Sequence, residues 1–267
     1  MNILKDKIVV YDGSCSLCTG LYDIVTKAGI VKASNCKAYF DMPEHLQSKI
    51  EEDRFKNEMA LIDIGNKPTS YGLDGIIIIL SDKWNFLQEI FKIRWLYHLL
   101  WFLYKTVARN RFILFPPKPN NGIRCSCEPP FSLKYRIAYI IITMMITIST
   151  IGFLVDVTLI RTIGLIWALQ LIISLIILSR SAALDYIGNL GTIMTGGALI
   201  LLPGIFYSLI IDNSQSTFLL VNGLISILFM LNQYIKRVRY LQLSKSWIMH
   251  GIIILSVTAS IINYLTS

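Results

Sequence analysis

The chain has 267 residues, of which 54% are hydrophobic and 16% are charged, and its formal net charge is +8 at pH 7. Because soluble domains contain roughly 25% charged residues, this composition excludes a protein that is soluble along its whole length. The basic excess is not gathered on one soluble segment, so we expect no nucleic acid partner.

Charge divides the chain near Ser132. Residues 1–132 carry 17 Lys and Arg and 14 Asp and Glu, whereas residues 133–267 carry only 8 and 3. We therefore predict a soluble domain over residues 1–130 and a helical transmembrane domain over residues 131–267. The N-terminal segment does not resemble a secretion signal, so we expect the first domain to lie in the cytoplasm.

Two cysteines stand directly after the first predicted strand. The β-branched residues within 7–11 and the Asp-Gly that follows predict a strand and a turn. Apolar residues at helical spacing then predict a helix over 14–28, which places Cys15 in its first turn and Cys18 three residues later. A helix start stabilises a thiolate, so we expect Cys15 to be the attacking thiol and Cys18 the resolving one.

Zinc binding is the alternative interpretation of this C-x-x-C sequence. A zinc site would need two further ligands, and Cys125 and Cys127 form the only second pair. Their C-x-C spacing is tighter than that of most zinc sites, so we expect no metal and no cofactor. Cys125 and Cys127 are instead either a second dithiol that exchanges electrons with the first pair, or residues that only pack.

The rest of the first domain alternates between strands and helices. We predict a strand over 35–40, polar helical structure over 44–57, and a hairpin that joins 59–64 to 69–71. A helix over 76–80 and an aromatic helix over 95–104 follow. The second helix either covers the sheet, which we favour, or lies in a membrane interface. Arg109 and Arg111 then either bind an anion or have structural roles.

Two separated motifs resemble the DCC family of thiol-disulfide oxidoreductase-like proteins. The opening motif, Tyr11 to Cys18, is similar to that family's Y-D-G-x-C-x-x-C, and the closing motif, Tyr104 to Phe115, is similar to its Y-x-x-x-A-R-N-R segment. The resemblance covers about residues 5–128. It implies an α/β thioredoxin-like fold and a redox pair at Cys15 and Cys18. Such folds usually have a proline before the strand that faces the pair, where this chain has Glu58.

Five apolar stretches, each near the ~20 residues that span a bilayer, follow in the second half. They cover about 137–155, 157–178, 188–211, 218–235 and 247–265. Lys and Arg collect before the first stretch, between the second and third, and between the fourth and fifth. This pattern predicts an integral, multi-pass membrane protein with its redox domain on the cytoplasmic side.

These features favour a membrane-anchored thiol-disulfide oxidoreductase, of the protein-disulfide reductase type, that acts on protein or small-molecule thiols and disulfides. One alternative is a membrane scaffold or transporter with a redox-sensing N-terminal domain, because five helices exceed what an anchor needs. Another is a quinone-linked dithiol oxidase. The oligomeric state and the direction of electron flow stay open.

Overall fold

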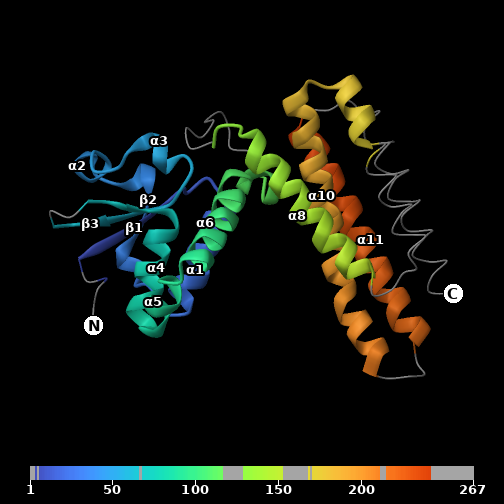
Figure 1. Ribbon diagram of the computed structural model, residues 1–267, viewed down its shortest axis with the longest axis horizontal. Helices are drawn as coiled ribbons and strands as arrows, with labels where there is room; N and C mark the ends of the chain where they lie inside the picture. Colours follow the sequence, from blue (N-terminus) through green and yellow to red (C-terminus); the bar gives the residue numbers. More distant parts are fainter. Residues whose placement is uncertain are drawn as a thin grey trace. The chain divides into compact units, whose positions relative to one another are not determined.

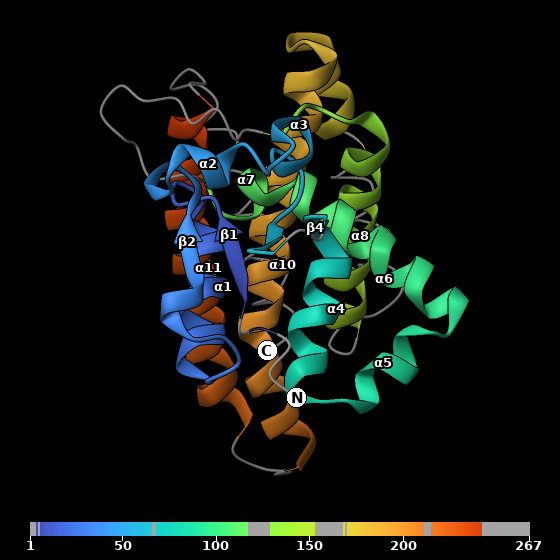
Figure 2. The same cartoon turned by 90° about the vertical axis from the view of Figure 1, so that its left-hand side faces the viewer.

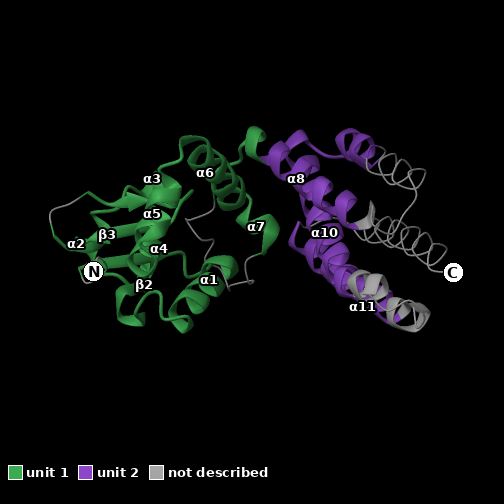
Figure 3. Cartoon of the chain, turned by 60° about the horizontal axis from the view of Figure 1, so that its bottom comes forward, with its two compact units in different colours: residues 1–135 green, residues 136–267 purple. Residues whose placement is uncertain are grey.

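The computed structural model describes residues 4, 6–65, 68–116, 129–152, 168, 170–210 and 215–241. The chain divides into two compact units, residues 1–135 and residues 136–267 (Figure 3). The first unit contains a small mixed four-stranded sheet with helices, and the described part of the second unit is helical. The structure therefore shows an α/β unit followed by a helical one.

The sheet has the order β2-β1-β3-β4 (Figure 1). Its strands are β1 (Lys7–Tyr11), β2 (Cys36–Ala38), β3 (Ala60–Asp63) and β4 (Ser70–Tyr71). β2 is parallel to β1, whereas β3 is antiparallel to both β1 and β4. The predicted strands are confirmed. The second is shorter than expected because a 3₁₀ turn at Tyr39–Asp41 ends it.

Two short helices cover one face of the sheet, α2 (Glu44–Gln47) and α3 (Glu52–Phe55) (Figure 1). Leu46, Ile50 and Phe55 pack there against Val10 and other residues of the strands. The sequence predicted continuous helical structure over 44–57, whereas the structure has two helices with a break between them. Within this break the backbone N–H of Glu51 donates to the Tyr71 hydroxyl at 2.7 Å. This tertiary hydrogen bond accompanies the break between the two helices.

The other face of the sheet carries α1 (Ser16–Lys27) and α4 (Gly72–Lys83). α5 (Phe86–Phe91), α6 (Arg94–Arg109) and α7 (Arg111–Leu114) follow. The predicted helices at 14–28, 76–80 and 95–104 are thus confirmed. α6 is joined to α4 by a hydrogen bond from the Tyr97 hydroxyl to Asp74, at 2.8 Å.

Gly72, the first residue of α4, has a φ of +60°, a conformation that other residues rarely adopt. An added Cβ would lie 2.9 Å from Cε1 of Tyr104 and would also meet the Glu58 carboxylate. We expect Gly72→Ala to lower the free energy of unfolding by about 1–3 kcal/mol. Thermal unfolding of the full chain, followed by tryptophan fluorescence, measures this loss.

Gly20→Ala is the matched control for Gly72→Ala. Gly20 lies inside α1, and an added Cβ there would have no heavy atom within 4 Å. Alanine in a helix interior should leave stability unchanged or raise it by about 0.5–1 kcal/mol. Equal stability changes in the two variants would contradict the strain assigned to Gly72.

The second unit is built on α8 (Leu133–Gly152), α10 (Arg180–Ile210) and α11 (Gln215–Tyr240). α10 and α11 run side by side (Figures 1 and 2). Two described helices are long and apolar enough to cross a membrane, over Leu133–Thr150 and Arg180–Pro203. The expected stretch at 218–235 lies within α11, which is not one of these two helices. Most of the expected stretch at 157–178, and all of that at 247–265, lie outside the described residues. Five spans therefore stay a prediction.

Small and hydroxyl-bearing residues hold these helices together. The Tyr139 hydroxyl lies 2.6 Å from Oγ1 of Thr192, which joins α8 to α10. Ser226 donates to the carbonyl of Gly197 at 2.9 Å, and a Cβ at Gly197 would clash with Met230 on α11. Close backbone approach with interhelical hydrogen bonds is typical of packing between membrane helices.

Arg136, which precedes the first predicted span, and Arg237, which lies between the fourth and fifth, belong to the Lys and Arg clusters that predict orientation, and both are buried inside this unit. Arg136 pairs with Asp185 at 3.0 Å, and Arg237 donates to Oδ1 of Asn189 at 2.7 Å. Their positions in the sequence suggested charges in the connections between spans. The structure shows that they also join helices, because a buried guanidinium requires hydrogen-bond acceptors from a neighbouring element.

Candidate functional site

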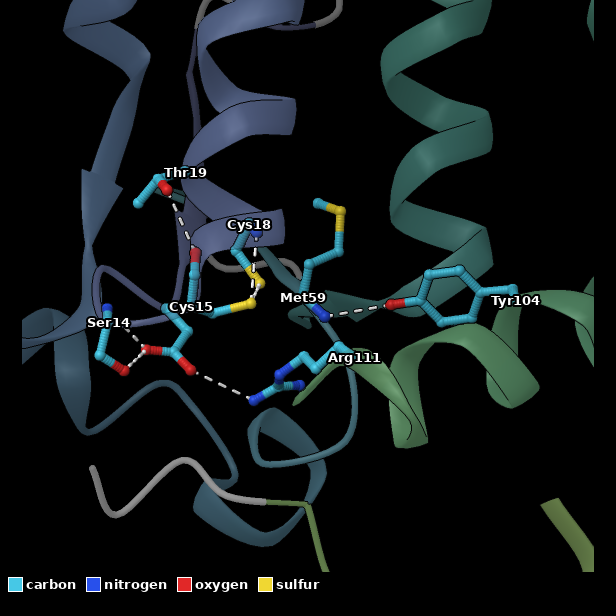
Figure 4. Close-up of polar contacts among 8 residues, drawn as sticks. Ser14, Cys15, Cys18, Thr19, Met59, Tyr104 and Arg111 are labelled. Carbon is cyan, nitrogen blue, oxygen red and sulfur yellow. Dashed lines mark hydrogen bonds and ion pairs between the residues drawn. The ribbon is translucent and has the colours of Figure 1, made fainter. Parts of the chain in front are cut away.

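Cys15 is the N-cap residue of α1, one position before the first helical turn in which the sequence placed it. Its sulfur accepts a hydrogen bond from the backbone N–H of Cys18 at 3.3 Å and from the Cys18 thiol at 2.6 Å (Figure 4). The sulfur therefore occupies the position of the side-chain oxygen that usually caps a helix. The two sulfurs of this thiol pair, Cys15 and Cys18, are in direct contact.

The surroundings of the thiol pair shift the pKa values of the two thiols in opposite directions. The hydrogen bond from the Cys18 thiol, then its backbone N–H, and the charge of Arg111 lower the pKa of Cys15 to about 7, against an opposing effect of burial. The hydrogen bond to Cys15 and burial raise the pKa of Cys18. Above about pH 7 the pair thus holds a single proton and carries one negative charge.

Asp12 connects the opening motif to the closing motif. Its Oδ1 accepts hydrogen bonds from the backbone N–H of Ser14 at 3.0 Å and from the Ser14 hydroxyl at 2.6 Å, which shapes the turn before Cys15. Its Oδ2 pairs with the guanidinium of Arg111 at 3.3 Å, although the two residues are 99 positions apart. Arg111, which we expected to bind an anion or to have a structural role, binds this carboxylate beside the thiols.

The closing motif also positions the start of β3. The backbone N–H of Met59 donates to the Tyr104 hydroxyl at 3.2 Å (Figure 4). Lys105 forms an ion pair with Glu58, the residue that stands where a proline was expected. Burial raises the pKa of Tyr104, which keeps its hydroxyl protonated. The guanidinium of Arg109 lies over the ring of Tyr135, with its Cζ 5.1 Å from the ring centroid.

Access to the two thiols differs in a way that the sequence did not predict. The Cys15 side chain is 0% exposed, whereas Cys18 is partly exposed. The expected apolar face of α1 is also only partly covered, since Leu21 is 52% exposed and Ile24 is 62% exposed. The spacing of apolar residues in the sequence identifies the apolar face of a strand or helix. Whether other side chains cover that face depends on how neighbouring elements pack against it.

The remaining cysteines are Cys36, Cys125 and Cys127. Cys36 lies in β2, is buried and free, and has a pKa raised to about 11 by burial. A thiol with that pKa is protonated at neutral pH and is a poor nucleophile. Cys125 and Cys127, named above as a second dithiol or as packing residues, lie outside the described residues. Among the described residues, no group of three or more His, Cys, Asp and Glu side chains forms a metal site.

Removing the Cys18 thiol should raise the pKa of Cys15. In Cys18→Ala, the thiolate loses its strongest hydrogen bond, so we expect its titration midpoint to move up from near pH 7 by about one pH unit or more. Ultraviolet thiolate absorbance of the reduced full chain, with Cys15→Ser as the blank, measures this midpoint. Cys36→Ser is the control and should leave the midpoint unchanged.

The sign of the linked stability change follows from the lowered pKa of Cys15. A thiolate with a pKa of about 7 in the folded chain and 9.0 in the unfolded chain stabilises the fold fully only above pH 9.0. This stabilisation is lost as the pH falls through about 7.

An unchanged titration midpoint of the Cys15 thiolate in Cys18→Ala would contradict the role assigned to the hydrogen bond from the Cys18 thiol.

No protein family model, curated protein or solved structure matches the chain.

Proposed function

We propose that the chain is a thiol-disulfide oxidoreductase in which Cys15 and Cys18 are the redox pair. The observation that carries this proposal is the ion pair between Asp12 and Arg111, which brings the two motifs of the DCC resemblance together around the thiols. The resemblance rests on two motifs that are far apart in the sequence, and contact between residues of both motifs beside the thiols supports it.

The topology of the first unit supports a thioredoxin-like fold for this domain. The sheet has the order β2-β1-β3-β4, and β3 is antiparallel to β1. Cys15 and Cys18 lie at the start of α1, the helix that follows β1. A strand, a turn and a C-x-x-C at a helix start is the arrangement expected of a dithiol redox site.

The proposed reaction transfers two electrons from the thiol pair to a disulfide. One cysteine forms a bond to a substrate sulfur, and the other substrate sulfur leaves as a thiol. The second cysteine then attacks the mixed disulfide, which forms the Cys15–Cys18 bond and releases the second substrate thiol. One of the two protons of the product thiols comes from the thiol pair, and the other comes from water. The sulfurs are 2.6 Å apart, so bond formation at about 2.05 Å needs little movement.

Oxidation of the reduced full chain by bis(2-hydroxyethyl) disulfide tests this proposal. We expect one Cys15–Cys18 disulfide and two equivalents of 2-mercaptoethanol for each chain, measured by peptide mass spectrometry and by thiol assay. Cys36→Ser should give the same stoichiometry. Recovery of Cys15 and Cys18 only as free thiols would overturn the proposed function.

We also propose that the protein is a multi-pass membrane protein with the thiol pair on the cytoplasmic side. The two apolar helices over Leu133–Thr150 and Arg180–Pro203 support membrane insertion, and the distribution of Lys and Arg in the sequence supports the orientation.

An accessibility experiment tests this orientation. In a variant without the native cysteines, we expect an impermeant thiol reagent to label a cysteine at position 214 in intact cells and to leave one at position 244 unlabelled. Both positions lie outside the described residues. The reverse labelling would place the thiol pair on the opposite side.

A further inference from the structure

A cavity of about 320 Å³ lies beside the thiol pair inside the first unit. The side chains that line it come from the sheet, α1, α4 and α6, and most are apolar, among them Val9, Leu17, Leu21, Val25, Ile79 and Val107. The stacked rings of Tyr11 and Tyr22, 4.8 Å apart, form part of the wall. This volume is at the lower end of the roughly 300–1,000 Å³ of small-molecule pockets.

The cavity reaches the thiol pair from the side of Cys18. Cys18 lines the cavity, whereas the Cys15 side chain is fully buried. A molecule in the cavity would therefore meet the sulfur of Cys18 first. Cys36 also lines the cavity, but among the described residues no side chain is hydrogen-bonded to its thiol, whereas Cys18 can pass its proton to Cys15.

Each of the three charged side chains that line the cavity, Asp12, Glu58 and Arg111, forms an ion pair. Asp12 pairs with Arg111, and Glu58 pairs with Lys105. A charged ligand would have to leave water without gaining a new counter-ion, at a high cost in free energy. The cavity is therefore suited to an uncharged molecule.

The start of β3 does not offer a backbone site for an extended peptide. The N–H of Met59 donates to Tyr104, and its carbonyl accepts from the N–H of Gly72 at 2.9 Å. Adding a substrate strand requires free backbone donors and acceptors. Both backbone groups of Met59 are engaged, which favours a small molecule over a peptide strand at this position.

We propose that this cavity is the substrate site and that it admits a small, uncharged, apolar disulfide that reacts first with Cys18. This inference rests on the proposed function. Attack by Cys18 reverses the order expected from the sequence and uses the minor protonation form of the pair. The proton, which the raised pKa of Cys18 holds on that sulfur, moves across the 2.6 Å contact to Cys15, and the Cys18 thiolate forms a bond to one substrate sulfur. The substrate S–S bond breaks, and the leaving thiolate takes a proton from water. Cys15 then attacks the sulfur of Cys18, which forms the Cys15–Cys18 bond and breaks the bond between Cys18 and the second substrate sulfur. The proton of Cys15 passes to that leaving sulfur, which departs as a thiol.

Two neutral disulfides of similar size probe the cavity, di-n-propyl disulfide and bis(2-hydroxyethyl) disulfide. Each oxidation rate of the reduced full chain is divided by the rate for free dithiothreitol in the same detergent, which corrects for intrinsic reactivity and for partition into micelles. We expect the apolar disulfide to react about tenfold faster after this correction, since apolar contacts of this size typically discriminate by roughly 10- to 200-fold.

Polar substitutions in the exposed part of the wall test whether the cavity causes this preference. Leu21 is 52% exposed and Val107 is 41% exposed, so Leu21→Gln and Val107→Gln should fold normally. We expect each to slow the apolar disulfide by about fivefold and to leave the hydroxyethyl disulfide unchanged within about twofold. Ile24→Gln, on the same helix as Leu21 but absent from the wall, is the matched control.

Trapping of the mixed disulfide identifies the sulfur that reacts first. In Cys15→Ser, we expect a stable propylthio adduct on Cys18, whereas in Cys18→Ser the buried Cys15 should react far more slowly. Mass spectrometry of the modified peptides measures both. A faster adduct on Cys15 would overturn the order of attack.

The outcomes separate this inference from the proposed function. Equal corrected rates for the two disulfides, or an apolar preference that Leu21→Gln and Val107→Gln do not reduce, would overturn the cavity as the substrate site while Cys15 and Cys18 still form a disulfide. Failure of both reagents to oxidise the pair would overturn the proposed function itself.

Discussion

Replacing Cys15 with serine is expected to lower the rate of disulfide reduction by about 10³-fold or more, because a single thiol forms a mixed disulfide but cannot resolve it. Cys15 supplies the sulfur that lies 2.6 Å from Cys18 and accepts its thiol hydrogen bond. No other described cysteine is placed to substitute, since Cys36 is in β2 and has a raised pKa. The release of substrate thiol with a dithiol reductant present measures this rate.

Cys36→Ser is the matched control for this loss, because Cys36 is also buried and also lines the cavity. With bis(2-hydroxyethyl) disulfide, which polar substitutions in the wall are expected to leave unaffected, Cys36→Ser should retain most of the wild-type rate. Circular dichroism of both variants should match that of the native chain. Retention of more than about a tenth of the rate in Cys15→Ser would contradict a reaction that depends on both thiols.

Replacing Arg111 with glutamine is expected to cost about 3–5 kcal/mol of folding free energy, because it removes a cation that pairs with the buried Asp12 carboxylate. Arg111 is 5% exposed and Asp12 is 3% exposed, so water does not replace the lost partner. The substitution also removes a positive charge that lowers the pKa of Cys15. Thermal unfolding and thiolate absorbance of the full chain measure the two effects.

Two further variants show whether the pair itself is responsible. In the double variant Asp12→Asn with Arg111→Gln, the buried charge is gone and the introduced amide retains an oxygen that accepts from Ser14, so part of the lost stability should return. Arg109→Gln is the matched single control, because Arg109 stacks on Tyr135 and does not pair with Asp12. An Arg111→Gln loss no larger than that of Arg109→Gln would contradict the assigned ion pair.

The sequence by itself determined the local elements of the first unit. β-Branched residues before Asp12-Gly13 predicted β1, and apolar spacing after Ser14 predicted α1, so the placement of Cys15 and Cys18 at a helix start followed from residues close together in the chain. The 59–71 hairpin and the helix after Asp74 were predictable for the same reason. These features depend on propensities and turn signals that neighbouring residues carry.

Only the tertiary structure decided how these elements form a site. The pairing of Asp12 with Arg111 and the hydrogen bond from Met59 to Tyr104 join segments 99 and 45 positions apart, and no local periodicity specifies them. The cavity likewise depends on how α1, α4 and α6 pack. The same packing buries Cys15 and places Cys18 in the cavity wall. Burial and ion pairing are properties of surfaces brought together by folding, so they become visible only once distant segments are in contact.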